Sequence, residues 1–206
     1  MNYKTIVTFV LITLGVLGGV TALLWNFGAK PQEAKQIADV AGEMRLKKGE
    51  GQVVVTEFSD FQCPACKSIQ DPLKQLLAKY EGKVTFVYRH FPLTTIHKNA
   101  VIAARAAEAA DKQGKFWEMH DLLFTRQGEW AELSDPKGKF VEYAMELKMD
   151  SAKFAADVDG EETSSAVALD TAAANKFAIS STPTFFVNGY ETDLAQLEIK
   201  IEEFLK

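Results

Sequence analysis

The stretch that decides the fold is residues 57–66, EFSDFQCPAC, in which two cysteines are separated by two residues. The run 53–58 (VVVTEF) is short and β-branched, which is typical of a buried strand. Residues 63–80 carry apolar side chains at helical spacing, and residues 84–88 (VTFVY) are again β-branched and aromatic. This order of strand, helix and strand predicts an α/β fold with a parallel pair of strands.

The cysteine pair stands at the start of the predicted helix. Pro64 suits the first helical turn, where its missing N–H costs nothing, and Ala65 completes the dipeptide between the cysteines. Free N–H groups and the positive end of the helix dipole stabilise a thiolate on Cys63. Cys66 lies one turn deeper and is the expected resolving thiol. The pattern therefore predicts an attacking sulfur, a resolving sulfur and a means of lowering the first pKa.

Three other uses of the pair fit the sequence less well. A structural disulfide between residues three apart closes a tiny loop and stabilises little. A zinc site needs two more ligands, and the sequence has three histidines and no second cysteine pair. A cysteine hydrolase has no need for Cys66. Redox chemistry is the expected use, with no metal.

Glu57 lies six residues before Cys63 in an otherwise apolar strand. Its side chain points either to solvent at a sheet edge or into the interior. In the second case burial raises its pKa, and the carboxyl accepts or relays the Cys66 proton through water. Apolar residues on both faces of the strand favour the buried position.

A second candidate segment lies near the C-terminus. Thr182-Pro183 precedes a predicted strand at 184–187 (TFFV), and Asn188-Gly189 is a hairpin turn signal. A proline that opens a strand cannot donate to the ladder, and a cis bond before it is a tight-turn device. Of the histidines, His90 is the one to follow, because it comes directly after a predicted strand.

The rest of the chain divides into a membrane segment, a tether and one domain. Residues 5–27 contain no charged side chain, and 23 residues at about 1.5 Å each can cross a bilayer core. A cleaved signal peptide is the alternative, but its apolar stretch is usually shorter. We expect a cytoplasmic end at 1–4, a transmembrane anchor at 5–27, a juxtamembrane tether at 28–48, helical from about 33 to 44, and a domain at 49–206.

Within that domain, residues 97–177 contain no convincing strand and predict a block of four or five helices.

The composition excludes other classes of protein. The 206 residues carry a net charge of −5, which disfavours nucleic-acid binding, and 47% of them are hydrophobic, which disfavours disorder.

Two motifs together carry a family resemblance. Residues 57–66, a helical insertion at about 97–177, and residues 181–189 (STPTFFVNG) resemble the DsbA-like branch of the thioredoxin superfamily. The resemblance implies that Cys63 is the nucleophile and Cys66 its partner in a redox-active disulfide, the only cofactor expected. It also implies that Thr182 and Pro183 face the cysteines, that the backbone of Thr182 binds an extended substrate, and that Glu57 is the buried acid of the family.

Two departures from that family pattern have consequences. The dipeptide Pro64-Ala65 lacks the histidine of the strongly oxidising member, so we expect a potential between about −270 and −120 mV. Only residues 190–192 and Asp193 lie between the hairpin turn and the last helix, predicted over 194–205, so the partner strand must be very short.

The expected function is that of a single-pass membrane protein whose catalytic domain is extracytoplasmic and monomeric. It would donate its Cys63–Cys66 disulfide to exported proteins and be recharged by a membrane oxidase of the DsbB or VKOR type. Two alternatives stay open: the reverse chemistry of a membrane-fed reductase or isomerase, and a non-catalytic module that binds peptides.

Overall fold

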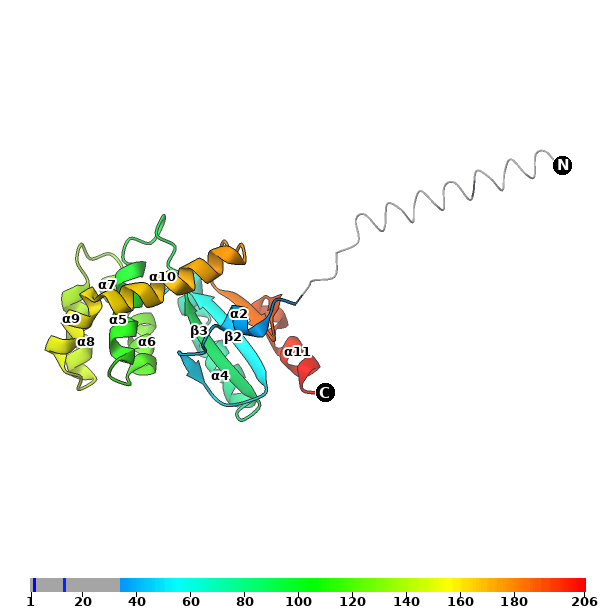
Figure 1. Cartoon of the computed structure of the whole chain (residues 1–206), viewed down its shortest axis with the longest axis horizontal. Coiled ribbons are helices and arrows are strands. Elements are labelled where there is room, and N and C mark those ends of the chain that lie inside the picture. Colours follow the sequence, from blue (N-terminus) through cyan, green and yellow to red (C-terminus); the bar gives the residue numbers. More distant parts are fainter. Residues whose placement is uncertain (1, 3–12, 14–33) are drawn as a thin grey trace. The chain divides into compact units, whose positions relative to one another are not determined.

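The computed structural model describes residues 2, 13 and 34–206, and residues 34–206 form one compact unit. This unit has the α/β thioredoxin fold with a helical insertion (Figure 1). No helix in the described part of the chain is long and apolar enough to cross a membrane. The predicted cytoplasmic end and anchor lie, apart from Asn2 and Thr13, outside the described residues, and they stay predictions.

The sheet has five strands in the order β1-β3-β2-β4-β5. The central strand β2 pairs in parallel with β3 and antiparallel with β4, and the short outer strands β1 and β5 pair antiparallel with β3 and β4. The predicted parallel pair is therefore present. The strands are β1 Lys47–Lys48, β2 Val53–Ser59, β3 Val84–His90, β4 Thr184–Val187 and β5 Tyr190–Thr192.

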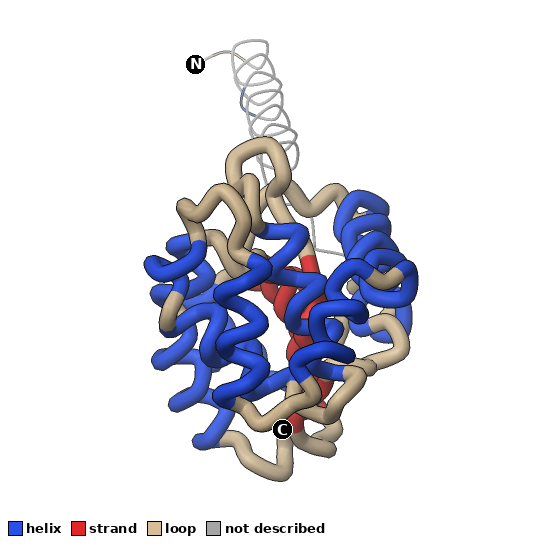
Figure 2. Tube along the Cα trace, turned by 90° about the vertical axis from the view of Figure 1, so that its left-hand side faces the viewer, coloured by secondary structure: helices blue, strands red, loops and turns tan. Residues whose placement is uncertain are grey.

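The helices cover the sheet and build the insertion. In Figure 1 helices α5 to α9 group beside the sheet, and α10 runs from that group back across it. Figure 2 shows helices on both sides of the strands. The helices are α2 Ile37–Ala41, α3 Pro64–Ser68, α4 Gln70–Lys79, α5 Ala100–Asp111, α6 Phe116–Thr125, α7 Gln127–Trp130, α8 Lys137–Glu146, α9 Ser151–Asp159, α10 Glu161–Lys176 and α11 Leu194–Phe204.

Two apolar cores lie on opposite faces of the sheet, because successive strand residues point to opposite sides. Val53 and Val55 join the larger core, which includes residues of α4, α6 and α11. Phe58 and Phe186 join the smaller core, which includes residues of α2 and α10. The strand β2 is thus buried on both faces, as a central strand of mixed pairing requires.

The helix expected from 63 to 80 is divided into α3 and α4. The division has a local cause in Pro72, which has no N–H for the carbonyl of Ser68 and whose ring clashes with it. α3 ends at Ser68, and Pro72 falls in the first turn of α4, where proline is tolerated. The short helix that carries the cysteines is therefore a separate element.

The tether predicted at 28–48 is, from Ala34 onward, part of the compact unit. Val40 and Ala41 are each 1% exposed, and Lys47–Lys48 add the strand β1 to the sheet. The expected helix is reduced to α2, because the chain turns at Gly42, whose φ of 61° is favourable only for glycine. The compact unit therefore begins at Ala34, within the predicted tether.

The hairpin at the C-terminal end follows the sequence closely. Asn188 and Gly189 both have positive φ, as a two-residue type I′ turn requires, and β5 has only three residues. The amide of Lys35 donates to the carbonyl of Gly189 at 2.9 Å. The hairpin therefore also holds the start of the compact unit.

Candidate active site

The two cysteines lie where β2 turns into α3. Cys63 is the N-cap of α3, Pro64 follows in its first turn, and the amide of Lys67 donates to the Cys63 carbonyl at 3.1 Å. Cys63 is 6% exposed and Cys66 is fully buried, and both thiols are free. This arrangement presents one sulfur at the surface and keeps the other behind it.

The two thiols have opposite tendencies to ionise. Hydrogen bonding from the Cys66 thiol lowers the pKa of Cys63 to about 5 against the opposing effect of burial, with further help from Thr182 and from the backbone N–H groups of Cys66 and Ala65. Burial, and then the same contact with Cys63, raises the pKa of the Cys66 thiol far above its ordinary value. The outer sulfur is a thiolate at neutral pH and the inner one a thiol.

The segment at Thr182-Pro183 meets the cysteines although it lies far along the chain. Its peptide bond is cis, and the Thr182 carbonyl oxygen lies 3.5 Å from the Cys63 sulfur. The segment reaches this position because β4, which begins at Thr184, pairs with β2, the strand that leads to Cys63. The sequence predicts this meeting through the family resemblance alone, since no local pattern links the two segments.

Glu57 lies inside the sheet and not at its edge. In the ladders it is opposite Tyr88 of β3 and Phe185 of β4, and its exposure is 0%. Neither of its carboxylate oxygens has a hydrogen-bond partner in the part of the chain that the structure describes. Burial is the main cause that raises the pKa of Glu57 to about 7, and the nearby Cys63 adds to it. The alternative that this side chain points to solvent at a sheet edge is therefore excluded.

The insertion supplies a side chain that the sequence did not single out. Gln127 of α7, 7% exposed, donates through its amide nitrogen to the carbonyls of Phe61 at 2.8 Å and Cys63 at 3.1 Å. Gln62 in turn donates to the carbonyl of Ala131, just after α7. These bonds fix the turn before the cysteines against the insertion. A glutamine beside a glycine gives no sequence signal of this role.

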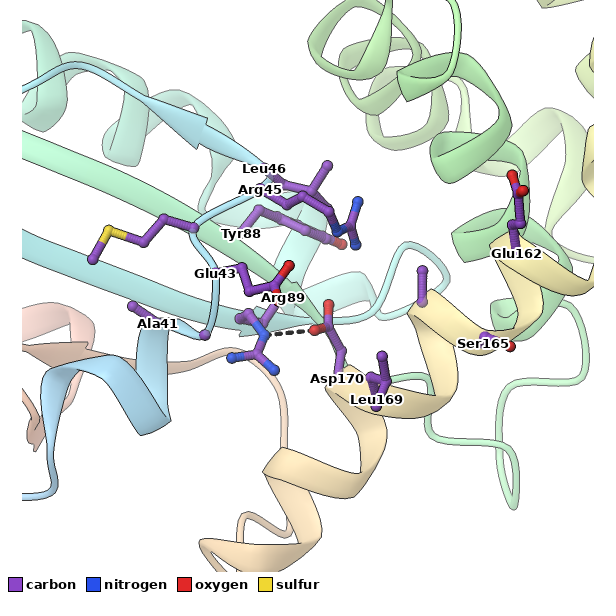
Figure 3. A pocket seen from close by; sticks show the side chains of 13 residues that line it. Ala41, Glu43, Arg45, Leu46, Tyr88, Arg89, Glu162, Ser165, Leu169 and Asp170 are labelled. Atoms are coloured by element: carbon purple, nitrogen blue, oxygen red, sulfur yellow. Dashed lines mark hydrogen bonds and ion pairs between the residues drawn. The ribbon is translucent and has the colours of Figure 1, made fainter.

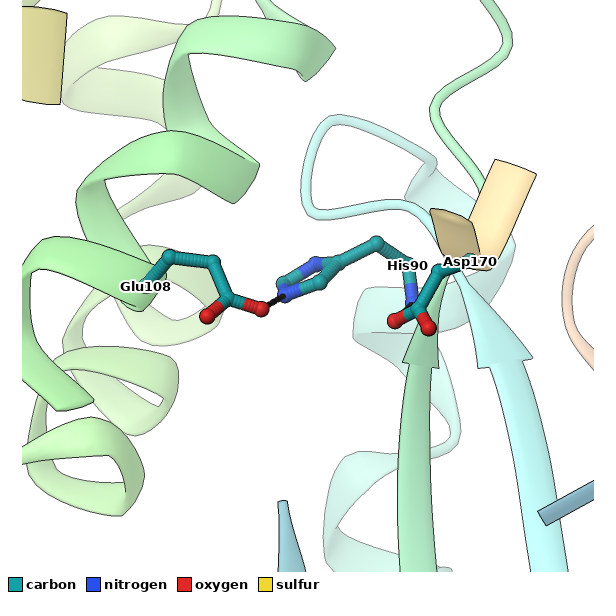
Figure 4. A group of neighbouring side chains, drawn as sticks. All are labelled: His90, Glu108 and Asp170. Carbon is teal, nitrogen blue, oxygen red and sulfur yellow. Dashed lines mark hydrogen bonds and ion pairs between the residues drawn. The ribbon is translucent and has the colours of Figure 1, made fainter. Parts of the chain in front are cut away.

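A second polar group lies farther along β3. The Nε2 of His90 lies 3.0 Å from a carboxylate oxygen of Glu108, and Asp170 accepts the backbone N–H of His90 at 3.0 Å (Figure 4). Among the described residues these three are the one group of three or more histidine, cysteine and acidic side chains whose ligand atoms all lie within 4.8 Å of one another.

Two arginines pair with the carboxylates of that set. Arg45 donates to both oxygens of Glu108 at 2.8 and 2.7 Å, and Arg89 donates to Asp170 at 2.6 Å. Figure 3 shows the Arg89–Asp170 pair in a pocket of about 540 Å³ between residues 41–46 and α10. The carboxylates are thus already neutralised, so the group acts as a charge network that joins the sheet to the insertion.

The sequence matches a family model over most of its length and part of several curated relatives. The family model described as Thioredoxin matches residues 40–206. The Na(+)/H(+) antiporter NhaA 3 of Salinispora tropica is 41% identical over 140 residues, which are 68% of this chain and 21% of that protein. The NhaA 1 antiporter of Mycolicibacterium gilvum is 35% identical over 171 residues, 80% and 27% of the two chains. The chain spans about a quarter or less of these relatives.

Solved structures share the fold over most of their length. A thioredoxin-like oxidoreductase from Silicibacter pomeroyi has a TM-score of 0.69 at 25% identity, covering 83% of this chain and 98% of its own. BdbD from Bacillus subtilis has a TM-score of 0.68 at 24% identity, covering 84% and 95%. The thiol-disulfide exchange protein alpha-DsbA2 from Wolbachia pipientis has a TM-score of 0.68 at 20% identity, covering 81% and 90%.

Proposed function

The chain belongs to the thioredoxin family and has the fold of the DsbA-like oxidoreductases, and from this premise we propose that it is a thiol–disulfide oxidoreductase that donates its Cys63–Cys66 disulfide to exported proteins. The observation that carries the proposal is the pair of thiols with opposite pKa shifts beside the Thr182 carbonyl. A structural cysteine pair has no need for either feature.

The exchange proceeds in two steps. A substrate thiolate attacks the Cys63 sulfur, the Cys63–Cys66 bond breaks, and Cys66 leaves as a thiolate that takes up a proton. A second substrate thiolate then attacks the substrate sulfur of the mixed disulfide, and Cys63 leaves as a thiolate. Two electrons pass from the substrate to the cysteine pair, so the substrate gains a disulfide. Cys63 is the better leaving group because its pKa is lowered to about 5.

The same lowered pKa supports the oxidising direction. A stabilised Cys63 thiolate stabilises the reduced form of the pair, and the disulfide is correspondingly easier to reduce. The value of about 5 falls between those of thioredoxin, near 7, and DsbA, near 3.5. An intermediate potential is therefore the expectation, in agreement with a dipeptide that lacks a cationic neighbour.

The remaining parts of the proposal concern place and partners. The apolar residues 5–27 would anchor the chain in the cell membrane, with the domain on the extracytoplasmic side. There the reduced pair would be reoxidised by a membrane partner of the DsbB or VKOR type. The backbone at Thr182, which starts the segment leading into β4, would pair with an extended substrate peptide.

The test is the reduction potential of the full-length protein, equilibrated in glutathione buffers, with the Cys63 thiolate titrated by ultraviolet absorbance in the same samples. We expect a potential above about −200 mV. The Cys63→Ser variant should lose exchange, and the Cys66→Ser variant should trap mixed disulfides with exported proteins. A potential near −270 mV would indicate a reductase, and an inert Cys63 would indicate a module that only binds peptides.

A further inference from the structure

Three polar side chains share one face of the sheet behind the cysteines. Glu57 and Ser59 are two residues apart on β2, so they point the same way, and Tyr88 stands opposite Glu57 in the parallel register with β3. Tyr88 lies in the larger core together with Cys66. A carboxyl, an aliphatic hydroxyl and a phenol therefore occupy positions at which apolar side chains are expected.

These side chains and Thr182 have buried polar atoms without a hydrogen-bond partner. Glu57, Ser59 and Tyr88 are each exposed by 1% or less. Native proteins contain few buried unpaired polar groups, because each forfeits the hydrogen bonds it made to water. We name Glu57, Ser59, Tyr88 and Thr182 the Cys66 polar cluster. The presence of four buried, unpaired polar side chains near the Cys66 sulfur is therefore not explained by stability.

Within this cluster the Ser59 hydroxyl is the neighbour common to the other groups. Its oxygen lies close enough to lower the pKa of Glu57, of Tyr88 and of Cys66 by favouring the ionised form, although none of these contacts has the geometry of a hydrogen bond in this structure. Burial, and then the charge of Glu57, raise the pKa of the Tyr88 phenol well above its ordinary value. Tyr88 therefore keeps its proton, and toward a carboxylate its hydroxyl can only donate.

We propose that Ser59 is a catalytic residue and Tyr88 a positioning residue for proton transfer. The Ser59 hydroxyl passes a proton from the Glu57 carboxyl to the Cys66 sulfur, and the Tyr88 hydroxyl donates a hydrogen bond to the Glu57 carboxylate that is left. When the Cys63–Cys66 bond breaks, the Cys66 thiolate takes the Ser59 proton while Ser59 takes the proton of Glu57. In total, Glu57 changes from a carboxylic acid to a carboxylate and Cys66 changes from a thiolate to a thiol. Ser59 gives up one proton and takes up another, so it is unchanged. This inference rests on the proposed function.

Several other titratable groups face this region and shape any pH profile. His90 and His120 pack their rings on Tyr88 at centroid distances of 5.2 and 5.1 Å, from β3 and α6. Burial lowers the pKa of His120. Asp60 follows Ser59 and accepts hydrogen bonds from His97 and from the Leu93 amide. The test therefore compares variants that change a single hydroxyl, so that these groups contribute equally to each profile.

The experiment measures how fast dithiothreitol reduces the oxidised full-length protein between pH 5 and 9, corrected for ionisation of dithiothreitol. Ser59→Thr and Ser59→Val have the same shape and differ only in the hydroxyl. We expect wild-type and Ser59→Thr rates to fall as Glu57 ionises, and Ser59→Val to be about tenfold slower below the midpoint of that fall and equal above it. Tyr88→Phe should move the midpoint to higher pH, since it removes a donor to the carboxylate.

A matched control is Tyr143→Phe, which removes a buried phenol bonded to Glu129 in the insertion and should leave the profile unchanged. The relay is overturned if Ser59→Val follows Ser59→Thr at every pH, or if Tyr88→Phe leaves the midpoint in place. If the wild type is still reduced rapidly by dithiothreitol, either of these results overturns the relay and leaves the proposed function standing. A wild type that reacts no faster than an unstrained disulfide peptide would instead overturn the proposed function.

Discussion

Two buried polar groups lie side by side on β3 and differ in one respect. Tyr88 belongs to the Cys66 polar cluster, whose members have polar atoms without partners. The next residues, Arg89 and His90, belong to a second group that we name the β3 charge cluster, formed by Arg45, Arg89, His90, Glu108 and Asp170. There each carboxylate oxygen has a donor. The same strand thus carries one group whose carboxyl is unpaired and one group whose carboxylates are all paired, although the Nδ1 of His90 in the second group also has no partner among the described residues.

The pairing explains the difference in ionisation between the two buried glutamates. Burial tends to raise the pKa of Glu108, but His90 and then Arg45 lower it to about 2. Glu57 has no cation beside it, and burial raises its pKa to about 7. A carboxyl that is always charged can hold two layers together but cannot exchange a proton near neutral pH. A carboxyl that titrates near pH 7 can do so.

The comparison teaches that burial alone does not tell a structural carboxyl from a functional one. The distinguishing feature is whether the protein supplies partners for the charged form. The β3 charge cluster joins the sheet to α5 and α10 of the insertion. The Cys66 polar cluster lies beside the reacting sulfur and is left unpaired. Variants that remove one partner from each group test this distinction.

The largest effect is expected for Asp170→Ala. Arg89 is 8% exposed and bonds Asp170 at 2.6 Å, so the variant leaves a buried guanidinium without its carboxylate. Removing one partner of a buried ion pair costs about 3–5 kcal/mol, and we expect denaturant unfolding to show a loss of this size. The exposed pair of Asp159 with Lys137 provides the control, because Asp159→Ala should change stability by less than about 0.5 kcal/mol. A loss no greater than the control's would mean that the β3 charge cluster does not hold the insertion.

The second effect, of about 3 kcal/mol, is a dependence of stability on pH. Because the pKa of Glu57 is higher in the folded protein, about 7, than its ordinary 4.5, the folded state binds more protons between these values. Relative to Glu57→Gln, the wild-type side chain should therefore lose stability as the pH rises from 4.5 through 7, and level off above. Both proteins are measured fully reduced with Cys63 in place, so that its charge still acts on residue 57 and its own titration contributes to both profiles. A pH-independent difference would contradict the raised pKa.

These residues also show how far the sequence could lead. The period-2 and 3.6 patterns predicted β2, β3, β4 and most helices, because each of these elements buries one or both of its faces. The short elements β1 and α7 lack such a pattern, and α7 is stabilised by contacts to a turn about 65 residues earlier in the chain. Cys63 and Cys66 are recognisable from spacing. Ser59 and Tyr88 are not, because their importance depends on a strand register.

The third effect concerns the reaction itself. Glu57→Gln keeps the shape of the side chain but cannot donate a carboxylic proton to Cys66, so we expect thiol–disulfide exchange below pH 7 to slow about a hundredfold. Folding should be unharmed, since the variant removes a buried group that ionises. Glu108→Gln, which changes the paired glutamate in the same way, should leave the exchange rate within about twofold of the wild type. Equal slowing in both variants would show that buried charge in general controls exchange.

The smallest effect is expected for Gln127→Leu. Gln127 combines features of the two clusters: its hydrogen bonds are satisfied, as in the β3 charge cluster, but it contacts the turn before Cys63. The variant leaves the carbonyls of Phe61 and Cys63 without their donor, which should cost about 1–2 kcal/mol in denaturant unfolding.

The pKa of Cys63 should stay near 5 in that variant, because the groups that lower it are the Cys66 thiol, Thr182 and the amides of Cys66 and Ala65. The hydrogen bonds of Gln127 go to the carbonyls of Phe61 and Cys63 and to none of these groups. Ultraviolet titration of the thiolate measures this directly, and Gln127→Glu, which cannot donate when ionised, should behave as Gln127→Leu does. A large rise in the Cys63 pKa would mean that the insertion sets the position of the helix α3 amides. In that case the hydrogen bonds of Gln127 would both stabilise the fold and set the reactivity of Cys63. The rule that paired polar groups are structural and unpaired ones functional would then hold for carboxyl groups alone.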